Sequence, residues 1–309
     1  MKHVFVVNPK AGKGKAAPKF VPQIHAYFKA HPELSYEVYE TREKRDGLTY
    51  TEQLAKTGEP IRFYACGGDG TLFEVINGAY QYENTQVACI PLGSGNDFAR
   101  ILGDRKALCD VAAQVEGTPR QFDLIRRDNQ VAISQCSMGL DAEVCAKQAT
   151  FKKLPGVSGE MAYTLSSVHC LFHRLNSDFK ILVDDKEVYN GPILFALCGN
   201  SRWYGGGYKG APLARPDDGL LDFILMKRTV GRLKLLSLLP TYKKGEHLDN
   251  PLTIFMRGKK MQVLSRDPRA VNVDGECQYV TESTFEILEK AVNFVIPTTS
   301  TYDEIVNAT

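Results

Sequence analysis

The sequence has 309 residues, of which 43% are hydrophobic and 24% are charged, a composition that excludes a disordered, collagen-like or fibrous chain. The formal charge of +2, from 38 Lys and Arg against 36 Asp and Glu, excludes a protein held on nucleic acid by a basic field. Because one core is hard to extend over this length, we expect two domains with a cleft between them.

The cysteines and the apolar segments bear on where the protein resides. Eight cysteines stand singly, with no CxxC pair. Zinc ribbons and redox motifs need such close pairs, so we expect reduced cysteines in a cytosolic protein. The apolar run 4–7 is too short for a signal peptide, and no segment approaches the roughly 20 apolar residues of a membrane span. The protein is therefore expected to be soluble, or to sit on a membrane without crossing it.

Four short apolar runs recur in the first hundred residues, each followed by a polar or glycine-rich loop and a helix-compatible stretch. The spacing of roughly 30 residues is typical of strand, helix, strand crossover units and predicts a doubly wound parallel sheet. In such sheets ligands bind outside the carboxyl ends of the strands, so the loops should form one site. The runs are 4–7, 36–39, 61–65 and 87–90.

The loop Gly67-Gly68-Asp69-Gly70-Thr71 carries the clearest chemical signal. Its glycines let backbone approach a phosphate, and the helix that starts beyond it offers free N–H groups to an anion. Asp69 would repel phosphate unless a divalent cation lay between them, which indicates a metal-bound nucleotide. A glycine turn with a capping aspartate is the alternative.

Two further loops that follow predicted strands also combine glycines with polar or charged side chains. The loop after the first strand interleaves Lys10, Lys13 and Lys15 with glycines, but it fits neither the Walker A motif nor the dinucleotide GxGxxG motif. An exposed basic turn is the alternative interpretation. The loop Gly93-Ser94-Gly95-Asn96-Asp97 offers a hydroxyl, an amide and a carboxylate, although Asn96 and Asp97 could instead cap a short helix.

The pattern changes from about residue 122 to short alternating segments broken by Asp-Asp, Asn-Gly and Asp-Gly turns. This predicts a second, antiparallel domain of sandwich or barrel type. Two helical stretches, 159–175 and 229–242, interrupt it. The predicted domains are 1–125 and 126–296, followed by a tail at 297–309. The expected strand segments of the second domain are 179–183, 188–189, 193–197, 221–226, 261–264, 271–274, 285–288 and 292–296.

Two acidic segments of the second domain could carry chemistry. Pro216-Asp217-Asp218-Gly219-Leu220-Leu221-Asp222 combines three carboxylates with a glycine that leaves carbonyls exposed, a set of oxygens suited to a hard cation. Val271-Asn272-Val273-Asp274-Gly275-Glu276 ends a strand with two carboxylates, and an aspartate there could accept a proton from an attacking hydroxyl. An Asp-Gly hairpin turn is the alternative for both.

Taken in order and spacing, these motifs resemble the diacylglycerol kinase catalytic-domain family in its bacterial lipid kinase branch. The resemblance runs from about residue 1 to residue 296. It implies an ATP-binding α/β domain like that of phosphofructokinases and NAD kinases, a β-sandwich second domain, and catalysis in the cleft. The motifs that carry it are Asn8-Pro9 with the following Gly/Lys loop, the loop 67–71, the segment 91–100, Asp217 to Asp222, and Asp274-Gly275-Glu276.

The resemblance also implies roles for single residues. Asp69 and Asp97 would join the network around the Mg²⁺ of the nucleotide. Asp274 would take the proton from the lipid hydroxyl, with Glu276 in support. A structural Mg²⁺ would be held by the Asp218 side chain and the carbonyls of Arg215 and Leu220. The residues implied to line the nucleotide are Asn8, Pro9, Lys10, Ala11, Gly12, Thr41, Gly67, Gly68, Asp69, Gly70, Thr71, Leu72, Phe73 and Ser94.

The expected protein is an ATP:lipid phosphotransferase of phospholipid metabolism, with ATP and Mg²⁺ as cofactors and diacylglycerol to phosphatidic acid as the leading reaction. Its expected partner is a lipid substrate at the membrane surface, with a homodimer left open and no nucleic acid. It would be cytoplasmic and peripheral at the inner membrane face, with the basic stretch 228–244, Lys13 and Lys15 facing anionic lipid. Burial of the leucines at 233–239 in the core is the alternative.

Two other functions stay open. A soluble kinase of the NAD kinase type would share the glycine-aspartate loop, although the acidic motifs of the second domain favour the lipid branch. A non-catalytic sensor of nucleotide or lipid would share the whole set of motifs. The acceptor is open as well, because monoacylglycerol, a sphingoid base, a polyprenol and a glycolipid all offer a hydroxyl beside an apolar tail.

Overall fold

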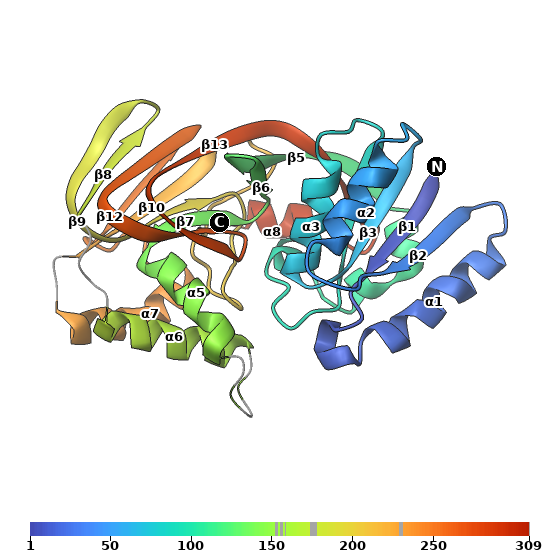
Figure 1. The fold of residues 1–309 in the computed structure, drawn as a ribbon, viewed down its shortest axis with the longest axis horizontal. Coiled ribbons are helices and arrows are strands. Elements are labelled where there is room, and N and C mark those ends of the chain that lie inside the picture. The colour runs from blue at the N-terminus through green and yellow to red at the C-terminus, as the bar shows by residue number, and fades with distance from the viewer. Residues whose placement is uncertain (152–153, 155–156, 158, 174–177, 229–230, 309) are drawn as a thin grey trace. The chain divides into compact units, whose positions relative to one another are not determined.

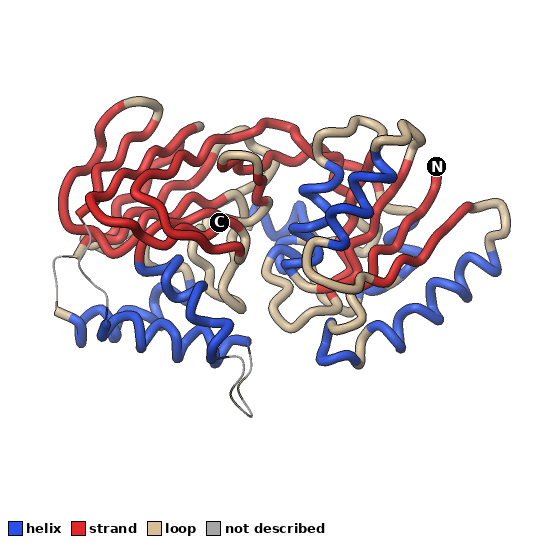
Figure 2. The backbone as a smooth tube through the Cα atoms, in the orientation of Figure 1, coloured by secondary structure: helices blue, strands red, loops and turns tan. Residues whose placement is uncertain are grey.

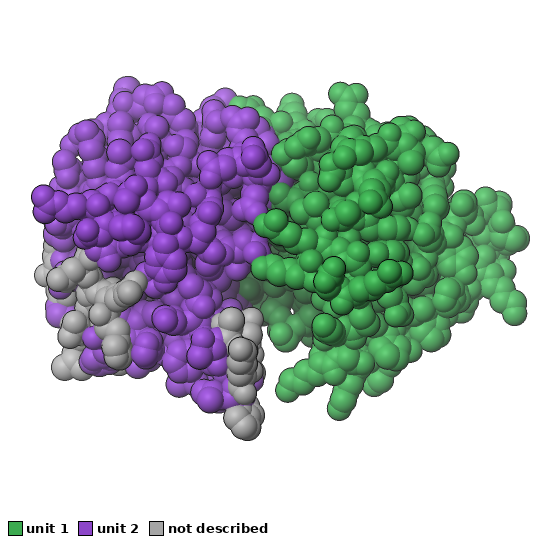
Figure 3. Space-filling view, viewed as in Figure 1, with its two compact units in different colours: residues 1–123, 289–309 green, residues 124–288 purple. Residues whose placement is uncertain are grey.

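The computed structural model describes residues 1–151, 154, 157, 159–173, 178–228 and 231–308. The chain divides into two compact units, residues 1–123 with 289–309 (unit 1) and residues 124–288 (unit 2) (Figure 3). It passes from unit 1 to unit 2 inside strand β5 (Thr118–Arg127) and returns inside strand β13 (Glu276–Ile296). The predicted boundaries were 125/126 and 296/297, so the structure differs chiefly in assigning residues 289–309 to unit 1.

Unit 1 contains the parallel sheet predicted from the apolar runs, in the spatial order β4-β3-β1-β2. The two central strands are buried on both faces, as continuous apolar runs in parallel sheets require. The final part of β13 adds to this sheet beside β4, with Phe294 opposite Val87. The four strands are β1 (Lys2–Val7), β2 (Ser35–Glu40), β3 (Ile61–Gly67) and β4 (Thr85–Pro91).

Helices cover both faces of this sheet (Figure 1). Helix α1 (Ala17–Ala30) packs its buried side chains against Phe5 and Val7 of β1. Side chains alternate between the faces of a strand, and Val6 accordingly lies toward α2, 3.4 Å from the place of a Cβ on Gly47. The other helices of the first part of unit 1 are α2 (Asp46–Ala55), α3 (Asp69–Ala79) and α4 (Val111–Val115), with 3-10 turns at Ala11–Gly14, Phe98–Ile101 and Ala107–Cys109.

The C-terminal residues form a structural part of unit 1 rather than a tail. Helix α8 (Tyr302–Asn307) buries Tyr302, whose ring centroid lies 5.3 Å from that of Phe122. The guanidinium of Arg120 lies 5.0 Å from the centre of the Tyr302 ring and also pairs with Asp303. These contacts link the last helix to the strand β5 that leaves the unit.

Unit 2 consists largely of strands (Figure 2). They pair antiparallel in the order β11-β10-β9-β7-β12-β13, while β8 pairs with both β9 and β12. This confirms the predicted antiparallel sandwich. Several segments predicted as separate strands are halves of one long strand, because each half pairs with a different neighbour. The remaining strands are β6 (Gln130–Ala132), β7 (Gln135–Gly139), β8 (Asp178–Val183), β9 (Lys186–Gly199), β10 (Leu221–Lys227), β11 (Thr253–Gly258) and β12 (Lys260–Val273).

Three helices gather on one side of unit 2 (Figure 1), namely α5 (Leu140–Phe151), α6 (Gly159–His173) and α7 (Arg232–Lys244). The second and third correspond to the predicted stretches 159–175 and 229–242, of which residues 174–175 and 229–230 lie outside the described part of the chain. Helix α5 was not predicted as a separate element. In the described residues, no helix is both long and apolar enough to span a bilayer.

Candidate functional site

The loops after β1 and β3 meet at the carboxyl edge of the parallel sheet. The two strands are neighbours although β2 and α2 lie between them in sequence, which makes this the topological switch point of the sheet. The backbone N–H of Asn8 donates to the Cys66 carbonyl at 3.0 Å. The Asn8 side-chain amide donates to the Thr71 hydroxyl at 3.4 Å. Residues from two predicted motifs are therefore in direct contact.

The loop after β4 packs against the same two loops through glycines. A Cβ on Gly93 would lie 2.4 Å from the Cα of Gly68, so only glycine allows the two backbones to approach this closely. Gly12 has a φ of 59°, and a Cβ there would lie 3.1 Å from the Leu92 carbonyl oxygen. The three glycine loops thus form one surface with exposed backbone.

Asp69 and Asp97 direct carboxylate oxygens to the same glycine. Asp69 Oδ1 accepts hydrogen bonds from the backbone N–H groups of Asp97 at 2.7 Å and Phe98 at 3.3 Å. A Cβ on Gly95 would lie 2.9 Å from Asp69 Oδ2 and 3.7 Å from Asp97 Oδ2. Two carboxylate oxygens beside a space that a Cβ would fill are donors of the kind Mg²⁺ prefers. Gly68 is the N-cap of α3, so Asp69 lies in the first turn of the helix and not at the cap position that the alternative interpretation predicted.

The other predicted nucleotide residues differ in exposure. Gly70 and Ser94 are exposed, and a Cβ on Gly70 would meet nothing within 4 Å. Thr41 donates its backbone N–H to the Val7 carbonyl at 2.9 Å and so lies at the end of β1. Leu72 and Phe73 are buried, 2% and 7% exposed, and contribute to the core that supports the loop.

Of two further side chains at this edge, Asn96 was predicted with its loop and Glu74 was not. Glu74 accepts hydrogen bonds from the backbone N–H groups of Arg45 at 2.8 Å and Gly47 at 3.0 Å. Glu74 therefore fixes the loop after β2. The only feature of the sequence that could have pointed to it is its position one helical turn beyond Thr71. Asn96 adopts a φ of 53° and is buried, with its Oδ1 lacking a hydrogen-bond partner among the described residues.

Asp274 lies in the two-residue turn of the β12–β13 hairpin, with a φ of 44°, and Gly275 follows with a φ of 103°. The hairpin interpretation is therefore also correct. The carboxylate is held by three backbone N–H groups of unit 2, because Oδ2 accepts from Ile133 at 2.7 Å and Ser134 at 3.1 Å, and Oδ1 accepts from Gln135 at 2.8 Å. A carboxylate has about four acceptor positions, and the Ser134 side chain is a further hydrogen-bond partner of Asp274.

Burial raises the pKa of Asp274 to about 6, against the three backbone N–H groups, which lower it. A carboxylate with a pKa in this range is ionised at neutral pH and is still basic enough to accept a proton. Glu276 faces Val273 across the hairpin and is partly exposed. The turn can therefore present a positioned proton acceptor beside a second acidic residue.

Asp218 is engaged by protein groups in the segment predicted to hold a structural metal. Its Oδ1 accepts from the Leu220 N–H at 3.1 Å, and its Oδ2 pairs with the Arg257 guanidinium. Arg257 also donates to Asp222 at 2.7 Å, and burial raises the pKa of Asp222 to about 6. Within the described residues no group of three or more His, Cys, Asp or Glu side chains is arranged for a metal. The donors are all oxygens, as Mg²⁺ requires, but a cation there would share Asp218 with Arg257.

The basic stretch at 228–244 contains both buried and exposed side chains. Leu235 is buried, and Leu238, Leu239 and Tyr242 line a pocket of unit 2. Lys234 is exposed. Of the leucines at 233–239 whose side chains are described, Leu235 is in the core and Leu238 and Leu239 are partly buried, while residues 229–230 and the side chains of Leu233 and Leu236 lie outside the described part.

Comparisons with known proteins place these motifs in two matched regions. The family described as "Diacylglycerol kinase catalytic domain" matches residues 2–127, and the family described as "YegS C-terminal NAD kinase beta sandwich-like domain" matches residues 134–296. A diacylglycerol kinase of Staphylococcus carnosus is 28% identical over 295 residues, which cover 94% of each chain. A diacylglycerol kinase of Staphylococcus aureus strain MRSA252 is 27% identical, covering 98% of this chain and 94% of the relative.

Solved structures show the same fold. A diacylglycerol kinase crystal structure from Bacillus anthracis str. Sterne has a TM-score of 0.68 and 21% identity, covering 95% of this chain and 96% of that one. An NAD kinase of Archaeoglobus fulgidus, solved in complex with ATP, has a TM-score of 0.54 and 16% identity, covering 97% of this chain and 94% of that one. The α/β unit followed by a β-sandwich unit is thus shared with both kinds of kinase.

Proposed function

Because the chain belongs to the diacylglycerol kinase catalytic-domain family, with that domain followed by the YegS-type β-sandwich domain, we propose that it is an ATP-dependent lipid kinase. Its reaction is transfer of the γ-phosphate to the hydroxyl of diacylglycerol, which gives phosphatidic acid. The observation that carries the proposal is the convergence of three glycine loops at one edge of the parallel sheet, with two carboxylate oxygens beside Gly95.

In this proposal unit 1 binds the nucleotide. The exposed backbone of Gly70 at the start of α3 and the hydroxyl of Ser94 contact phosphate oxygens. The loops at residues 8–12 and 67–73, together with Thr41, line the rest of the nucleotide. Asp69 and Asp97 hold Mg²⁺, which when bound supplies positive charge to the phosphate oxygens.

Unit 2 supplies the proton acceptor. The lipid hydroxyl donates its proton to the Asp274 carboxylate, and the oxygen forms a bond to the γ-phosphorus as the bond to the β-phosphate oxygen breaks and ADP leaves. The three backbone N–H groups from residues 133–135 fix the direction of this carboxylate, so little reorganisation is needed in the transition state. Glu276 supports the base from the facing strand.

The membrane role is a further part of the proposal. A lipid acceptor is delivered from a bilayer, and we propose that the protein is cytoplasmic and contacts the inner membrane face reversibly. Lys13 and Lys15 are exposed beside the first glycine loop, and each basic side chain near an anionic surface contributes about 1 kcal/mol.

The proposal is tested by incubating the protein with Mg²⁺, γ-labelled ATP and a mixed lipid extract in detergent micelles, with the products resolved by mass. We expect phosphorylated diacylglycerol with the wild type and a loss of about two to four orders of magnitude with Asp274→Asn. Asp185→Asn is the matched control, because Asp185 also occupies a left-handed hairpin turn, with a φ of 65°, and has no proposed role.

Other outcomes would redirect the assignment. Phosphorylation of a different lipid would keep the kinase and change the acceptor. Phosphorylation of NAD or a sugar, with no labelled lipid, would favour the soluble kinase. ATP binding with no product from any acceptor would favour a nucleotide sensor.

A further inference from the structure

Two cysteines lie against the hairpin turn that carries Asp274. Cys145 belongs to α5, and Cys277 is the second residue of β13, opposite Asn272 across the hairpin. The Cys145 sulfur lies 3.6 Å from Asn272 Oδ1 and 3.9 Å from the Gly275 carbonyl oxygen. The Cys277 sulfur lies 3.9 Å from each of the same two oxygens. Two thiols from distant parts of the sequence therefore share one position beside the turn.

This thiol pair differs from the other cysteines in its surroundings. Burial raises the pKa of a thiol and makes it a poor nucleophile, and burial also raises the pKa of the partly exposed Cys109 in unit 1. Cys145 and Cys277 are both partly exposed, and each has a second thiol beside it. The buried cysteines are Cys66, Cys89, Cys136, Cys170 and Cys198.

The position of the pair allows a bond between the two sulfurs after a movement of the backbone. The Cys277 sulfur also lies 3.8 Å from the carbonyl oxygen of Ala142, which is one turn before Cys145 on the same side of α5. A disulfide needs Cβ atoms about 3.5–4.5 Å apart, so closure draws the hairpin and the helix together. A Cβ on Gly275 would meet nothing within 4 Å, which leaves room for a small oxidant beside the turn.

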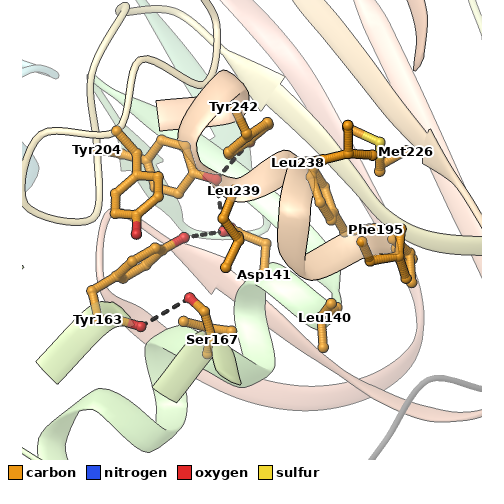
Figure 4. Close-up of a pocket in the computed structure, with 14 residues that line it drawn as sticks. Leu140, Asp141, Tyr163, Ser167, Phe195, Tyr204, Met226, Leu238, Leu239 and Tyr242 are labelled. Carbon is orange, nitrogen blue, oxygen red and sulfur yellow. Dashed lines mark hydrogen bonds between the residues drawn. The ribbon is translucent and has the colours of Figure 1, made fainter. Parts of the chain in front are cut away.

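Helix α5 is held more firmly than the turn. Asp141, in its first turn, is buried and accepts hydrogen bonds from the hydroxyls of Tyr163 at 2.6 Å and Tyr204 at 2.7 Å (Figure 4). The Tyr279 hydroxyl donates to Glu143 at 2.8 Å and joins β13 to the same helix. Closure of the disulfide would therefore displace the end of the hairpin, because the helix and the strand beyond the turn are fixed to each other.

Displacement of the turn would change the direction of the Asp274 carboxylate. The Asp274 N–H donates to the Gln135 carbonyl at 3.1 Å, and the carboxylate accepts from the N–H groups of residues 133–135. The Gly275 N–H donates to Asn272 Oδ1 at 2.7 Å, so the residue that both sulfurs contact also supports the turn. A disulfide has no S–H to donate to these oxygens, and it pulls on the backbone that these hydrogen bonds position.

We propose that Cys145 and Cys277 form a reversible disulfide when the protein meets a peroxide, and that the disulfide displaces Asp274 and slows phosphotransfer. The effect on phosphotransfer rests on the proposed lipid kinase function, whereas formation of the disulfide does not.

The proposed oxidation proceeds in two displacements. One thiolate attacks the peroxide, so that an S–O bond forms, the O–O bond breaks and hydroxide leaves as water after protonation. The second thiol attacks the sulfenic acid, so that the S–S bond forms, the S–O bond breaks and a second water leaves. The two sulfurs lose two electrons in total, and the peroxide is reduced to two waters.

The first test detects the disulfide without any activity measurement. The reduced protein is treated with hydrogen peroxide, the remaining thiols are alkylated with N-ethylmaleimide, and the digest is analysed by mass. We expect a cross-linked pair of peptides that contain Cys145 and Cys277. Cys109→Ser should retain the cross-link, and Cys277→Ser should lack it. Alkylation or over-oxidation of both cysteines in the wild type, without the cross-link, would overturn the inference.

The second test follows the turn by hydrogen exchange. The N–H groups of Ile133, Ser134 and Gln135 are protected by Asp274, so displacement of the carboxylate should make them exchange about tenfold faster in the oxidised wild type. Dithiothreitol should restore the slow exchange, and peroxide should have no effect on Cys277→Ser. Unchanged exchange in the cross-linked protein would contradict displacement of the turn.

The third test measures phosphorylation of diacylglycerol. We expect peroxide to lower kcat of the wild type about tenfold and dithiothreitol to restore it. Cys145→Ser and Cys277→Ser should keep the rate of the reduced wild type after peroxide, because serine retains a hydrogen-bond donor and forms no disulfide. If lipid is phosphorylated but kcat does not respond to the cross-link, the effect on phosphotransfer is wrong and the proposed function stands. If the cross-link forms but the reduced protein phosphorylates no lipid, the proposed function fails and the disulfide stands.

Discussion

Two opposing effects determine the ionisation of Asp274. Burial raises its pKa to about 6, although three backbone N–H groups favour the carboxylate and lower it. The N–H groups orient the carboxylate oxygens, while burial keeps the carboxylate basic. For an aspartate in a hairpin turn this combination is unusual, since turn aspartates are commonly solvated.

The first prediction follows from that pKa. If Asp274 is the base, kcat/KM for the lipid acceptor should rise with pH through about 6 and level off above it, because only the carboxylate accepts a proton. Initial rates at low acceptor concentration between acid and neutral pH measure this. A profile without a limb near 6 would remove Asp274 from the role. For stability the sign is opposite, since a raised acid pKa stabilises the fold below the ordinary 3.8 and that contribution is lost as pH rises through about 6.

The second prediction separates two glycines of the nucleotide edge. Gly70→Ala meets open space in helix α3, so it should stabilise the fold by up to about 1 kcal/mol. If Gly70 lines the nucleotide as proposed, the new methyl group faces the phosphates and should weaken MgATP binding about tenfold. Gly93→Ala would place a Cβ 2.4 Å from the Gly68 Cα and should destabilise the fold by about 1–3 kcal/mol. Thermal unfolding and calorimetric titration with MgATP give both quantities. Unaltered MgATP affinity in Gly70→Ala would place the nucleotide elsewhere.

At the scale of elements, ion pairs link the segment 215–222 to strand β11. Arg257 pairs with Asp218 and with Asp222, whose side chain is fully buried. Such an arrangement replaces part of what a bound cation would provide, because a guanidinium neutralises two carboxylates at once. It also keeps β11 attached to the loop that precedes β10.

The third prediction concerns metal dependence of this segment. Arg257→Gln should lower the free energy of unfolding by about 2 kcal/mol, and Mg²⁺ should restore more stability in this variant than in the wild type, where Arg257 shares Asp218. Thermal unfolding with Mg²⁺ and with a chelator measures the difference, and Arg266→Gln, at an exposed position, is the control. If Mg²⁺ has no effect on the variant, the predicted structural cation site at Arg215, Asp218 and Leu220 is wrong.

The elements that could be predicted from sequence were those with local signals. The four strands of the parallel sheet follow from continuous apolar runs, and their loops share one edge because parallel strands end on the same side. Strand β9 was predicted as two segments because Asn190-Gly191-Pro192 is typical of a turn. The strand continues through it, since β8 pairs with the residues before and β10 with those after.

Side chains whose partners are distant in sequence could not be predicted. Asp141 accepts hydrogen bonds from the hydroxyls of Tyr163 and Tyr204, which are 22 and 63 residues away. Arg257 stands in an ordinary strand and acquires its role from Asp218, 39 residues earlier. No local pattern distinguishes such residues from other members of a helix or strand, because propensity and periodicity report burial and not the identity of a partner.

At the scale of the whole molecule, each unit contains one deeply buried histidine among the side chains that the structure describes. His3 bonds to the Tyr64 hydroxyl at 2.7 Å in unit 1, and His247 bonds to the Gly210 carbonyl at 3.1 Å in unit 2. Burial lowers the pKa of each to about 4. The stability of both units should therefore fall as the pH is lowered, because each unit buries an imidazole in its neutral form.

The fourth prediction is acid destabilisation from these two residues. A lowered histidine pKa stabilises the fold above the ordinary 6.5, and this contribution is lost as pH falls through about 4. The loss should be about 2 kcal/mol for each histidine after solvent screening. Denaturant unfolding at several pH values should show a smaller acid loss in His3→Gln and in His247→Gln than in the wild type. His25→Gln, at an exposed position, should unfold with the wild-type pH dependence, and equal slopes in all variants would contradict the linkage.

The return of β13 into unit 1 bears on how the protein is made. A ribosome releases β1 to β4 early, but Phe294, which pairs with Val87, and Tyr302, which packs on Phe122, emerge only after the whole of unit 2. The edge of β4 and the surface of Phe122 stay uncovered in the nascent chain until then, and such edges attract wrong partners. The unit that begins synthesis is thus the last to be completed, and a chain released before residue 289 would carry a finished unit 2 and an unfinished unit 1.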